Sequence, residues 1–200
     1  MVTLSPQDQA TLLQLARMAI ATGVTERRHM MVETTRYPEA LQAKRATFVT
    51  LTLNGELRGC IGNLDADRSL VEDVVHNAGA AALSDPRFPP VTAAEIERLR
   101  LQISVLNPAK TMTFDSERDL IRQLRPGIDG LILQDDNHRA TFLPSVWESL
   151  PDPAGFIQHL KLKAGLPADY WSATVKVSRY TTMSFKDPEC PPALPYNTLK

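Results

Sequence analysis

Hydrophobic residues recur at helical spacing in the first part of the chain. Ser5 followed by Pro6 is a typical helix start, because a serine side chain caps the first turn and proline fits the first helical position. The apolar positions that follow share one helical face and are Leu12, Leu15, Ala16, Ala19 and Ile20. Gly23 is placed to end the segment. The pattern therefore predicts a helix from Pro6 to about Gly23.

The next hydrophobic segment has the character of strands. Residues 48–53 and 56–61 are rich in β-branched and apolar residues. The Asn54-Gly55 pair between them is the strongest short-range signal for a hairpin. The sequence therefore predicts two antiparallel strands joined by a two-residue turn.

Helices and strands are interspersed over the rest of the chain. The pattern predicts helices that begin at Asp67 or Ser69, at Thr92 (with Glu95 completing a capping box), at Asp115 or Ser116, at Pro144 and at Asp152. It predicts strands within residues 101–106, 128–133, 138–143 and 175–177. Because hairpins force antiparallel pairing, the expected class is α+β, an antiparallel sheet flanked by helices. We expect one domain over residues 1–186, with a smaller lobe within about 108–145, and a proline-rich tail over 187–200.

Composition and charge narrow the classes of function. The 200 residues are 43% hydrophobic and 22% charged, which is ordinary for a globular protein. A formal net charge of -1 lacks the basic excess of a dedicated nucleic-acid binder, so nucleic acid is not expected as a strong ligand. No apolar run approaches the ~20 residues that span a bilayer, and no secretory signal is found. With two cysteines, Cys60 and Cys190, we expect a cytoplasmic protein with reduced thiols.

The run Leu57–Asn63 is the candidate for chemistry. A two-residue turn would pair Leu51 with Arg58 and Val49 with Cys60, so that Arg58 and Cys60 share one face of the hairpin. A neighbouring guanidinium favours the thiolate, which is the nucleophilic form of cysteine. Cys60 is therefore a candidate catalytic residue. The alternative is that it packs as a small hydrophobe, as most free cysteines do.

Residues around this run are candidates for binding a ligand. Gly59 and Gly62 have no side chains, so another molecule could approach the backbone there. A bulge at either glycine would change the register. Asp85 and Arg87 lie in a loop stiffened by prolines, and Asp85 is a candidate partner for the Arg58 guanidinium. The alternative for this loop is a helix end with solvated charges.

Motifs for metals and phosphates do not occur. The sequence has no Cys-x-x-Cys, His-x-x-x-His or Gly-x-x-x-x-Gly-Lys pattern, so no metal is expected and no cofactor is indicated. A nucleophilic cysteine usually needs a base such as histidine. The histidine nearest in sequence is His76, for which a place on a helix surface is the alternative. Trp147 and Trp171 are predicted to be packing residues.

The chain resembles AMMECR1-domain proteins. The resemblance rests on the hexapeptide Leu57-Arg58-Gly59-Cys60-Ile61-Gly62. It continues in the same order with Asp85-Pro86-Arg87-Phe88, Ile103-Ser104-Val105-Leu106, Pro126-Gly127-Ile128-Asp129-Gly130-Leu131, Thr141-Phe142-Leu143-Pro144 and Lys163-Ala164-Gly165-Leu166. The matched motifs span roughly residues 10–185. Asn63 and Ser145 depart from the residues that are familiar at those positions in the family.

The resemblance implies a fold and a place for the site. The implied fold is an antiparallel sheet flanked by helices, plus a smaller lobe, with the Arg-Gly-Cys segment at or near a cleft between them. It also implies an association with Memo-like and radical-SAM proteins in bacteria and archaea. It implies no established reaction.

The sequence and the resemblance therefore lead to three hypotheses for the function. The first is a cleft that binds a small molecule or peptide, with Cys60 as the thiol of an enzyme. Its candidate substrate-binding residues are Arg58, Gly59, Gly62, Asn63, Asp85 and Arg87. The second is a non-catalytic scaffold for Memo-like or radical-SAM partners. The third is an accessory role in RNA or DNA transactions, which the charge balance disfavours.

Overall fold

The computed structural model describes residues 3–187 and divides the chain into two compact units. The first, called here the N-terminal unit, comprises Leu4–Ser104 and the last described residues from Ser184 onward. The second, called the central unit, comprises Val105–Met183. The proline-rich tail predicted from the sequence lies, apart from its first residue, outside the described residues.

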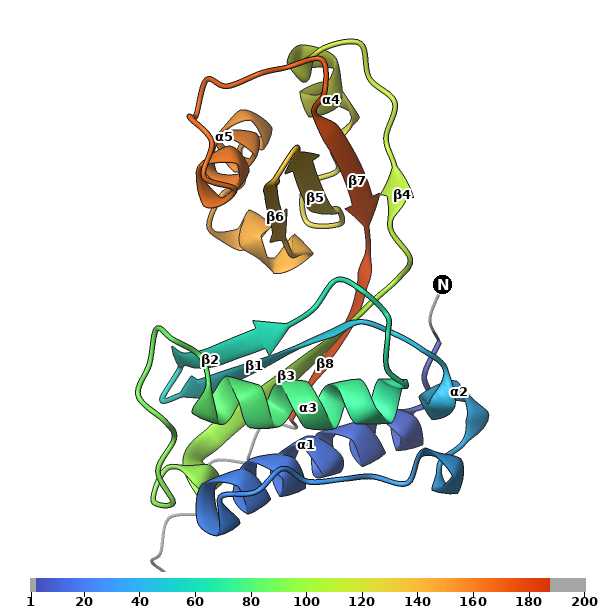
Figure 1. Cartoon of the computed structure of the whole chain (residues 1–200), viewed down its shortest axis with the longest axis vertical. Coiled ribbons are helices and arrows are strands. Elements are labelled where there is room, and N and C mark those ends of the chain that lie inside the picture. The colour runs from blue at the N-terminus through green and yellow to red at the C-terminus, as the bar shows by residue number, and fades with distance from the viewer. Residues whose placement is uncertain (1–2, 188–200) are drawn as a thin grey trace, which may run out of the picture. The chain divides into compact units, whose positions relative to one another are not determined.

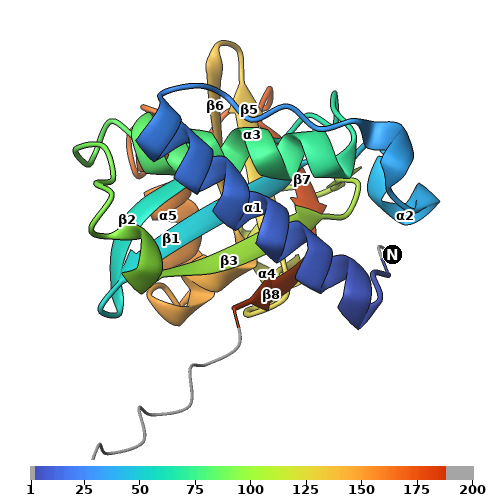
Figure 2. The same cartoon turned by 90° about the horizontal axis from the view of Figure 1, so that it is seen from below.

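The N-terminal unit is a four-stranded sheet of order β2-β1-β3-β8. In chain order its elements are α1 (Pro6–Glu26), a 3-10 turn (Thr34–Arg36), α2 (Glu39–Gln42), β1 (Thr47–Leu53), β2 (Glu56–Gly62), α3 (Leu70–Leu83), a 3-10 turn (Ile96–Arg98), β3 (Leu99–Leu106) and β8 (Thr182–Lys186). Figures 1 and 2 show α1 and α3 side by side on one face of this sheet. The predicted α+β class is confirmed.

Local signals explain where these elements begin. The Ser69 hydroxyl accepts a hydrogen bond from the Glu72 backbone N–H, and the Glu72 carboxylate accepts one from the Ser69 N–H. This capping box satisfies the first free N–H groups of α3. Asn54 and Gly55 both have positive φ (54° and 90°), as the two-residue turn between β1 and β2 requires. The predicted hairpin turn and the Ser69 cap are therefore confirmed.

The predicted end of the first helix is wrong. α1 continues beyond Gly23 to Glu26 and ends where Arg27 adopts a left-handed φ of 53°. Gly23 instead lies where α1 passes close to α3, because a Cβ there would be 2.9 Å from Leu83 Cδ1. The glycine serves close helix packing and does not act as a C-cap.

The helix predicted from Thr92 is also wrong, although its capping contacts exist. The Thr92 N–H and hydroxyl donate to the Glu95 carboxylate at 2.7 and 2.8 Å. Only the short 3-10 turn Ile96–Arg98 follows. Because β3 begins at Leu99, the segment between Thr92 and β3 is too short for an α-helix.

The hydrophobic core of this unit lies between the helices and the sheet. Val49 and Leu51 of β1 are fully buried, as are Leu12 of α1 and Val74 of α3. In β3 the core residues of this unit lie on one face of the strand and are Leu99, Leu101 and Ile103. The buried face of the sheet therefore faces the helices.

The central unit is a second four-stranded sheet, of order β4-β7-β5-β6. Its elements are β4 (Lys110–Thr111), α4 (Glu117–Gln123), β5 (Gly130–Asp135), β6 (His138–Phe142), a 3-10 turn (Pro144–Glu148), α5 (Pro153–Lys163) and β7 (Lys176–Tyr180). Trp147 stacks on Phe156 with ring centroids 3.8 Å apart, and Trp171 packs on the same core. The predicted packing roles of the tryptophans are confirmed. The late strand expected within residues 175–177 is longer and forms β7, with β8 following it.

We predict that Gly59→Ala destabilises the fold. A Cβ at Gly59 would lie 2.2 Å from the Ala81 carbonyl oxygen of α3, and backbone cannot yield as a flexible side chain can. We expect the free energy of unfolding to fall by roughly 1–3 kcal/mol, the usual cost of overpacking. Urea denaturation measures it, and an unchanged midpoint would show that α3 can shift freely on β2.

Candidate functional site

The hairpin register differs from the one predicted. The strands pair as expected at Leu53–Glu56, but a bulge follows, and beyond it Thr50 lies opposite Cys60. Arg58 is the additional residue in the bulge. The prediction that Val49 pairs with Cys60, and Leu51 with Arg58, is therefore wrong, and with it the shared face of Arg58 and Cys60.

The two glycines of the run are in close contact with the protein itself. Gly59 is packed against the backbone of α3 at Ala81, as described above. A Cβ at Gly62 would lie 2.4 Å from the Thr47 carbonyl oxygen and 2.3 Å from the Phe48 ring. The close approach to the backbone that the sequence predicts exists at both glycines. In each case the approaching atoms belong to another segment of this chain.

The partner of Arg58 is Glu95. The Arg58 Nε and Nη2 atoms donate to the Glu95 carboxylate at 2.8 and 3.2 Å. The same guanidinium donates to the carbonyl oxygens of Pro89 and Pro90 at 2.8 and 3.3 Å. The proposed pairing of Arg58 with Asp85 is therefore wrong. The Arg58 side chain is only 12% exposed, so a carboxylate must neutralise it.

Asp85 and Arg87 instead bind the backbone of Cys60. β2 is an edge strand, so one side of its backbone has no neighbouring strand. The Asp85 carboxylate accepts a hydrogen bond from the Cys60 N–H at 2.8 Å. The Arg87 Nη2 atom donates to the Cys60 carbonyl oxygen at 3.3 Å and to the Asp85 carboxylate at 2.7 Å. The loop therefore takes both outward backbone groups of the cysteine.

Electrostatics keep this pair ionised. Asp85 is buried, yet its hydrogen bonds from the Arg87 side chain hold the pKa of its carboxyl well below the usual range, with the Cys60 N–H adding to the effect. The Asp85 carboxylate in turn raises the pKa of Arg87, and Cys60 contributes in the same direction. The guanidinium that interacts with the cysteine is thus that of Arg87, and not that of Arg58.

Cys60 is half-buried, and its sulfur lies 3.3 Å from the Thr50 hydroxyl oxygen. These two residues are opposite one another in the ladder and so share a sheet face. Among residues 3–187 no histidine is hydrogen-bonded to this sulfur, and His76 lies exposed on α3. The thiol has a hydroxyl and a guanidinium as polar neighbours.

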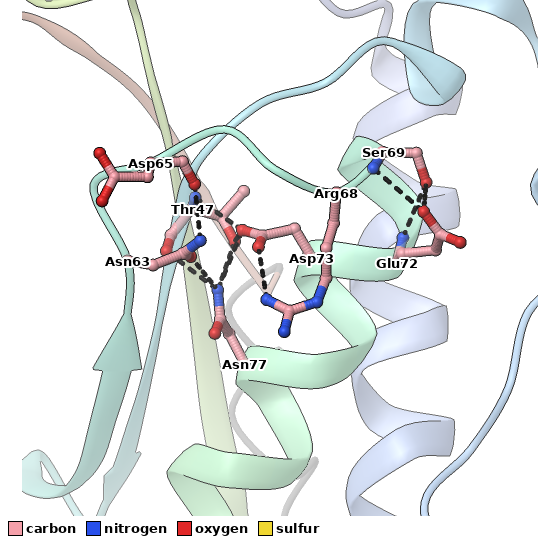
Figure 3. A network of polar contacts seen from close by, with 8 residues as sticks. All are labelled: Thr47, Asn63, Asp65, Arg68, Ser69, Glu72, Asp73 and Asn77. Atoms are coloured by element: carbon pink, nitrogen blue, oxygen red, sulfur yellow. Dashed lines mark hydrogen bonds and ion pairs between the residues drawn. The ribbon is translucent and has the colours of Figure 1, made fainter.

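Asn63 belongs to a separate buried network, drawn in Figure 3. Its side-chain oxygen accepts from Asn77 at 3.1 Å, and Asn77 also donates to Asp73 at 3.0 Å. Asp73 accepts from the N–H and hydroxyl of Thr47 at 2.8 and 2.6 Å. The Arg68 guanidinium lies 3.7 Å from its other oxygen, and burial nevertheless raises the pKa of Asp73. This network joins the end of β2 to α3.

Sequence reasoning missed Glu95, Asp73 and Asn77. A signal for the last two was present, because they are four residues apart and lie on the apolar face of α3, where both are buried. Glu95 was recognised only as a capping residue. Nothing in the sequence shows that one carboxylate both caps a turn and pairs with Arg58.

Within residues 3–187 no three His, Cys, Asp or Glu side chains are grouped as a metal ion would need. Among the same residues no helix has the length and apolar character to cross a membrane.

Known proteins resemble this chain over both of its units. A family model described as AMMECR1 matches residues 13–185. A protein of Methanothermobacter thermautotrophicus is 33% identical over 190 residues, which are 92% of this chain and 96% of that protein. A protein of Methanocaldococcus jannaschii is 37% identical over 161 residues, 76% and 78% of the two chains. The crystal structure of an uncharacterized protein from Pyrococcus horikoshii superposes with a TM-score of 0.82 at 33% identity, covering 88% of this chain and 90% of that one.

We predict that the Arg58–Glu95 pair stabilises the fold in a pH-dependent way. Hydrogen bonds from Arg58, and then from Thr92, lower the pKa of Glu95 from 4.5 to about 2. Because the folded-state pKa is the lower one, the stabilisation is present above pH 4.5 and is lost as the pH falls toward 2.

Arg58→Met should therefore lower the free energy of unfolding by roughly 1.5–3 kcal/mol at pH 7, and by less at pH 2. Arg36→Met is the control, because Arg36 pairs with Glu33 while its side chain is 77% exposed, and we expect little effect. Equal losses for Arg58→Met at both pH values would contradict the assignment.

Proposed function

The chain belongs to the AMMECR1 family, and from the arrangement around Cys60 we propose that it binds a small acidic molecule at Arg87, with the Cys60 thiol as the reactive group. The observation that carries this proposal is the Asp85–Arg87 pair. It binds the cysteine by both backbone groups, and the Arg87 guanidinium held there also interacts with the cysteine side chain. A thiol held next to a fixed cation is the usual environment of a reactive cysteine.

Arg87 has capacity left for a ligand. Its Nε and Nη2 atoms are engaged by Asp85 and by the Cys60 carbonyl oxygen. Among the described residues its Nη1 atom has no hydrogen-bond partner, and the side chain is 53% exposed. A guanidinium presents donors in a planar fork that suits a carboxylate or a phosphate. An acidic group bound there would lie next to the Cys60 sulfur.

The covered strand edge favours a small molecule over a peptide. Peptides that bind by strand addition need the free backbone groups of an edge strand. At Cys60 these groups are taken by Asp85 and Arg87, and the carbonyl oxygens of Pro89 and Pro90 are tied to Arg58 in the bulge. A ligand is therefore expected to contact side chains at this point of β2.

The thiolate is the chemically important species. The Arg87 guanidinium attracts negative charge that develops on the sulfur, and the Thr50 hydroxyl can donate a hydrogen bond to it. With no histidine hydrogen-bonded to the sulfur among residues 3–187, its proton would pass to solvent. The proposed enzyme activity is therefore that of a half-buried, cation-assisted thiol.

We predict that Arg87→Gln slows alkylation of Cys60. In a Cys190→Ser background, the rate with iodoacetamide at pH 7 should fall about three- to tenfold, because the cation that favours the thiolate is gone. The double variant Asp85→Asn/Arg87→Gln removes the Asp85 charge as well and should remain slow. Arg98→Gln is the control, since Arg98 is exposed and binds Asn54. A rate unchanged by Arg87→Gln would remove the thiolate argument.

Ligand binding is tested with the same reaction. Inorganic phosphate and succinate, as simple anions, should slow the alkylation of Cys60 in the parent protein and should have no such effect in Arg87→Gln. Equal effects in both proteins would show that the anions do not act through Arg87.

A further inference from the structure

A pocket in the central unit is lined by three cations and by no carboxylate of the described residues. Its volume is about 450 Å³, within the range of roughly 300–1,000 Å³ that is usual for small-molecule sites. The cations are Lys110, Arg125 and Arg179, and the other residues of the lining are neutral. All of them belong to the central unit. The charge of this lining indicates an anionic occupant.

Two of the cations lie opposite one another in the sheet. Lys110 of β4 is paired with Arg179 of β7, so their side chains share one sheet face (Figure 1 shows the two strands side by side). Like charges at directly opposite positions of an antiparallel ladder destabilise the pairing. Among residues 3–187 the Lys110 ammonium takes part in no hydrogen bond or ion pair. An anion that contacts both side chains would supply the compensation that the described residues do not.

A single buried carboxylate serves the two arginines. The Asp129 side chain is fully buried, and its Oδ1 atom accepts from Nε and Nη2 of Arg125 at 3.1 and 2.6 Å. The Nη1 atom of Arg179 lies 3.9 Å from Asp129 Oδ2 and donates to the Gln123 carbonyl oxygen at 3.4 Å. Arg125 alone can neutralise the charge of Asp129. Three cations and one carboxylate therefore leave two positive charges in excess.

The cations have donors left for a ligand. Among the described residues, Nη1 of Arg125 has no hydrogen-bond partner, nor have Nε and Nη2 of Arg179. The two side chains are 50% and 37% exposed, and Lys110 is exposed as well. The Thr181 hydroxyl accepts from the Asn107 side chain at 2.8 Å, and within residues 3–187 it donates its own proton to no other group. The lining can therefore bind several oxygen atoms at once.

The excess charge matches a phosphate monoester more closely than a single carboxylate. A phosphate monoester carries about −1.5 to −2 charges at pH 7 and has three strong acceptor oxygens. A carboxylate carries one charge and would leave one cation uncompensated. Guanidinium forks suit phosphate oxygens, and lysine binds phosphate as a point charge. The number of cations thus favours a phosphate group.

The arrangement of the cations favours a small molecule over a nucleic acid. Lys110 and Arg179 are ladder partners, and Arg179 and Arg125 both lie within 4 Å of Asp129. The three cations therefore converge on one place. Nucleic-acid binders present basic residues along a stripe or face and usually carry a basic excess, whereas this chain has a net charge of -1.

We propose that this pocket binds the phosphate group of a small phosphorylated molecule, with Lys110 and Arg179 as its charge partners and Arg125 as a further donor. The site lies in the central unit and does not depend on the function proposed for Cys60. A Cys60→Ser variant is therefore expected to bind the phosphate as the parent does.

The test is a titration of the full chain with inorganic phosphate, phenyl phosphate and benzoate, followed by amide NMR. The signals of Lys110 and Arg179 should shift saturably with both phosphates, and phenyl phosphate should bind there about tenfold more tightly than benzoate. Signals at Arg87 report the other proposed anion site separately, so either proposal can fail alone. No saturable shift at Lys110 and Arg179, or equal affinities for phenyl phosphate and benzoate, would overturn the proposal. Tighter binding of a short oligoribonucleotide than of phenyl phosphate would overturn the choice of a small molecule.

A matched pair of lysine variants tests the assigned contact. Lys110→Gln should weaken the binding of phenyl phosphate about tenfold, because one of the two excess charges is lost. Lys176→Gln is the control, since Lys176 is exposed on the same strand as Arg179 and lies outside the lining. Equal affinities of the two variants for phenyl phosphate would contradict the role of Lys110.

Charge reversal at the same position separates binding from folding. In Lys110→Glu a carboxylate lies opposite Arg179, so repulsion across the ladder becomes attraction. The melting temperature without added anion should rise by about 1–4 °C, while the binding of phenyl phosphate should be lost. A lower melting temperature would show that Lys110 supports the fold, and would overturn the argument from ladder repulsion. Binding that survives the charge reversal would overturn the proposed site.

Discussion

The backbone of an edge strand has one side without a neighbouring strand, and this constraint organises the region around Cys60. β2 is such a strand, and at Cys60 its outward N–H and C=O are bound by Asp85 and Arg87. Asp85 is buried, so it can remain charged there only while its hydrogen bonds persist. The 85–87 loop and the edge of β2 are therefore held together. The position of Arg87 beside the thiol follows from this contact.

The bulge next to Cys60 depends on the same loop. Arg58 leaves the regular ladder, and its guanidinium binds Glu95 and two carbonyl oxygens of the loop. A bulge disrupts ladder pairing, and here side-chain contacts from outside the sheet compensate for that loss. The Asp85–Arg87 pair thus binds the edge of β2, and the Arg58–Glu95 pair holds Arg58 in the bulge. Together they decide which residue lies opposite Thr50.

The elements of this fold were more predictable from the sequence than its contacts. Helix α3 and the turn between β1 and β2 follow from short-range signals at Ser69 and Asn54-Gly55, and both form where those signals predict. The pairing register beyond the turn could not be predicted from such short-range signals. The bulge that sets it is stabilised by the contact of Arg58 with Glu95, which lies 37 residues further along the chain. A sequence identifies charged residues as needing partners, but the pairing is decided by the tertiary structure.

The central claim, that Asp85 binds the strand edge at Cys60, is tested most directly by amide hydrogen exchange measured by NMR. The Cys60 amide should be protected in the parent protein, although it points away from β1. In Asp85→Ala this protection should be lost at Cys60, while the interior amides of α3 keep theirs. An unprotected Cys60 amide in the parent protein, or protection that survives Asp85→Ala, would contradict the account.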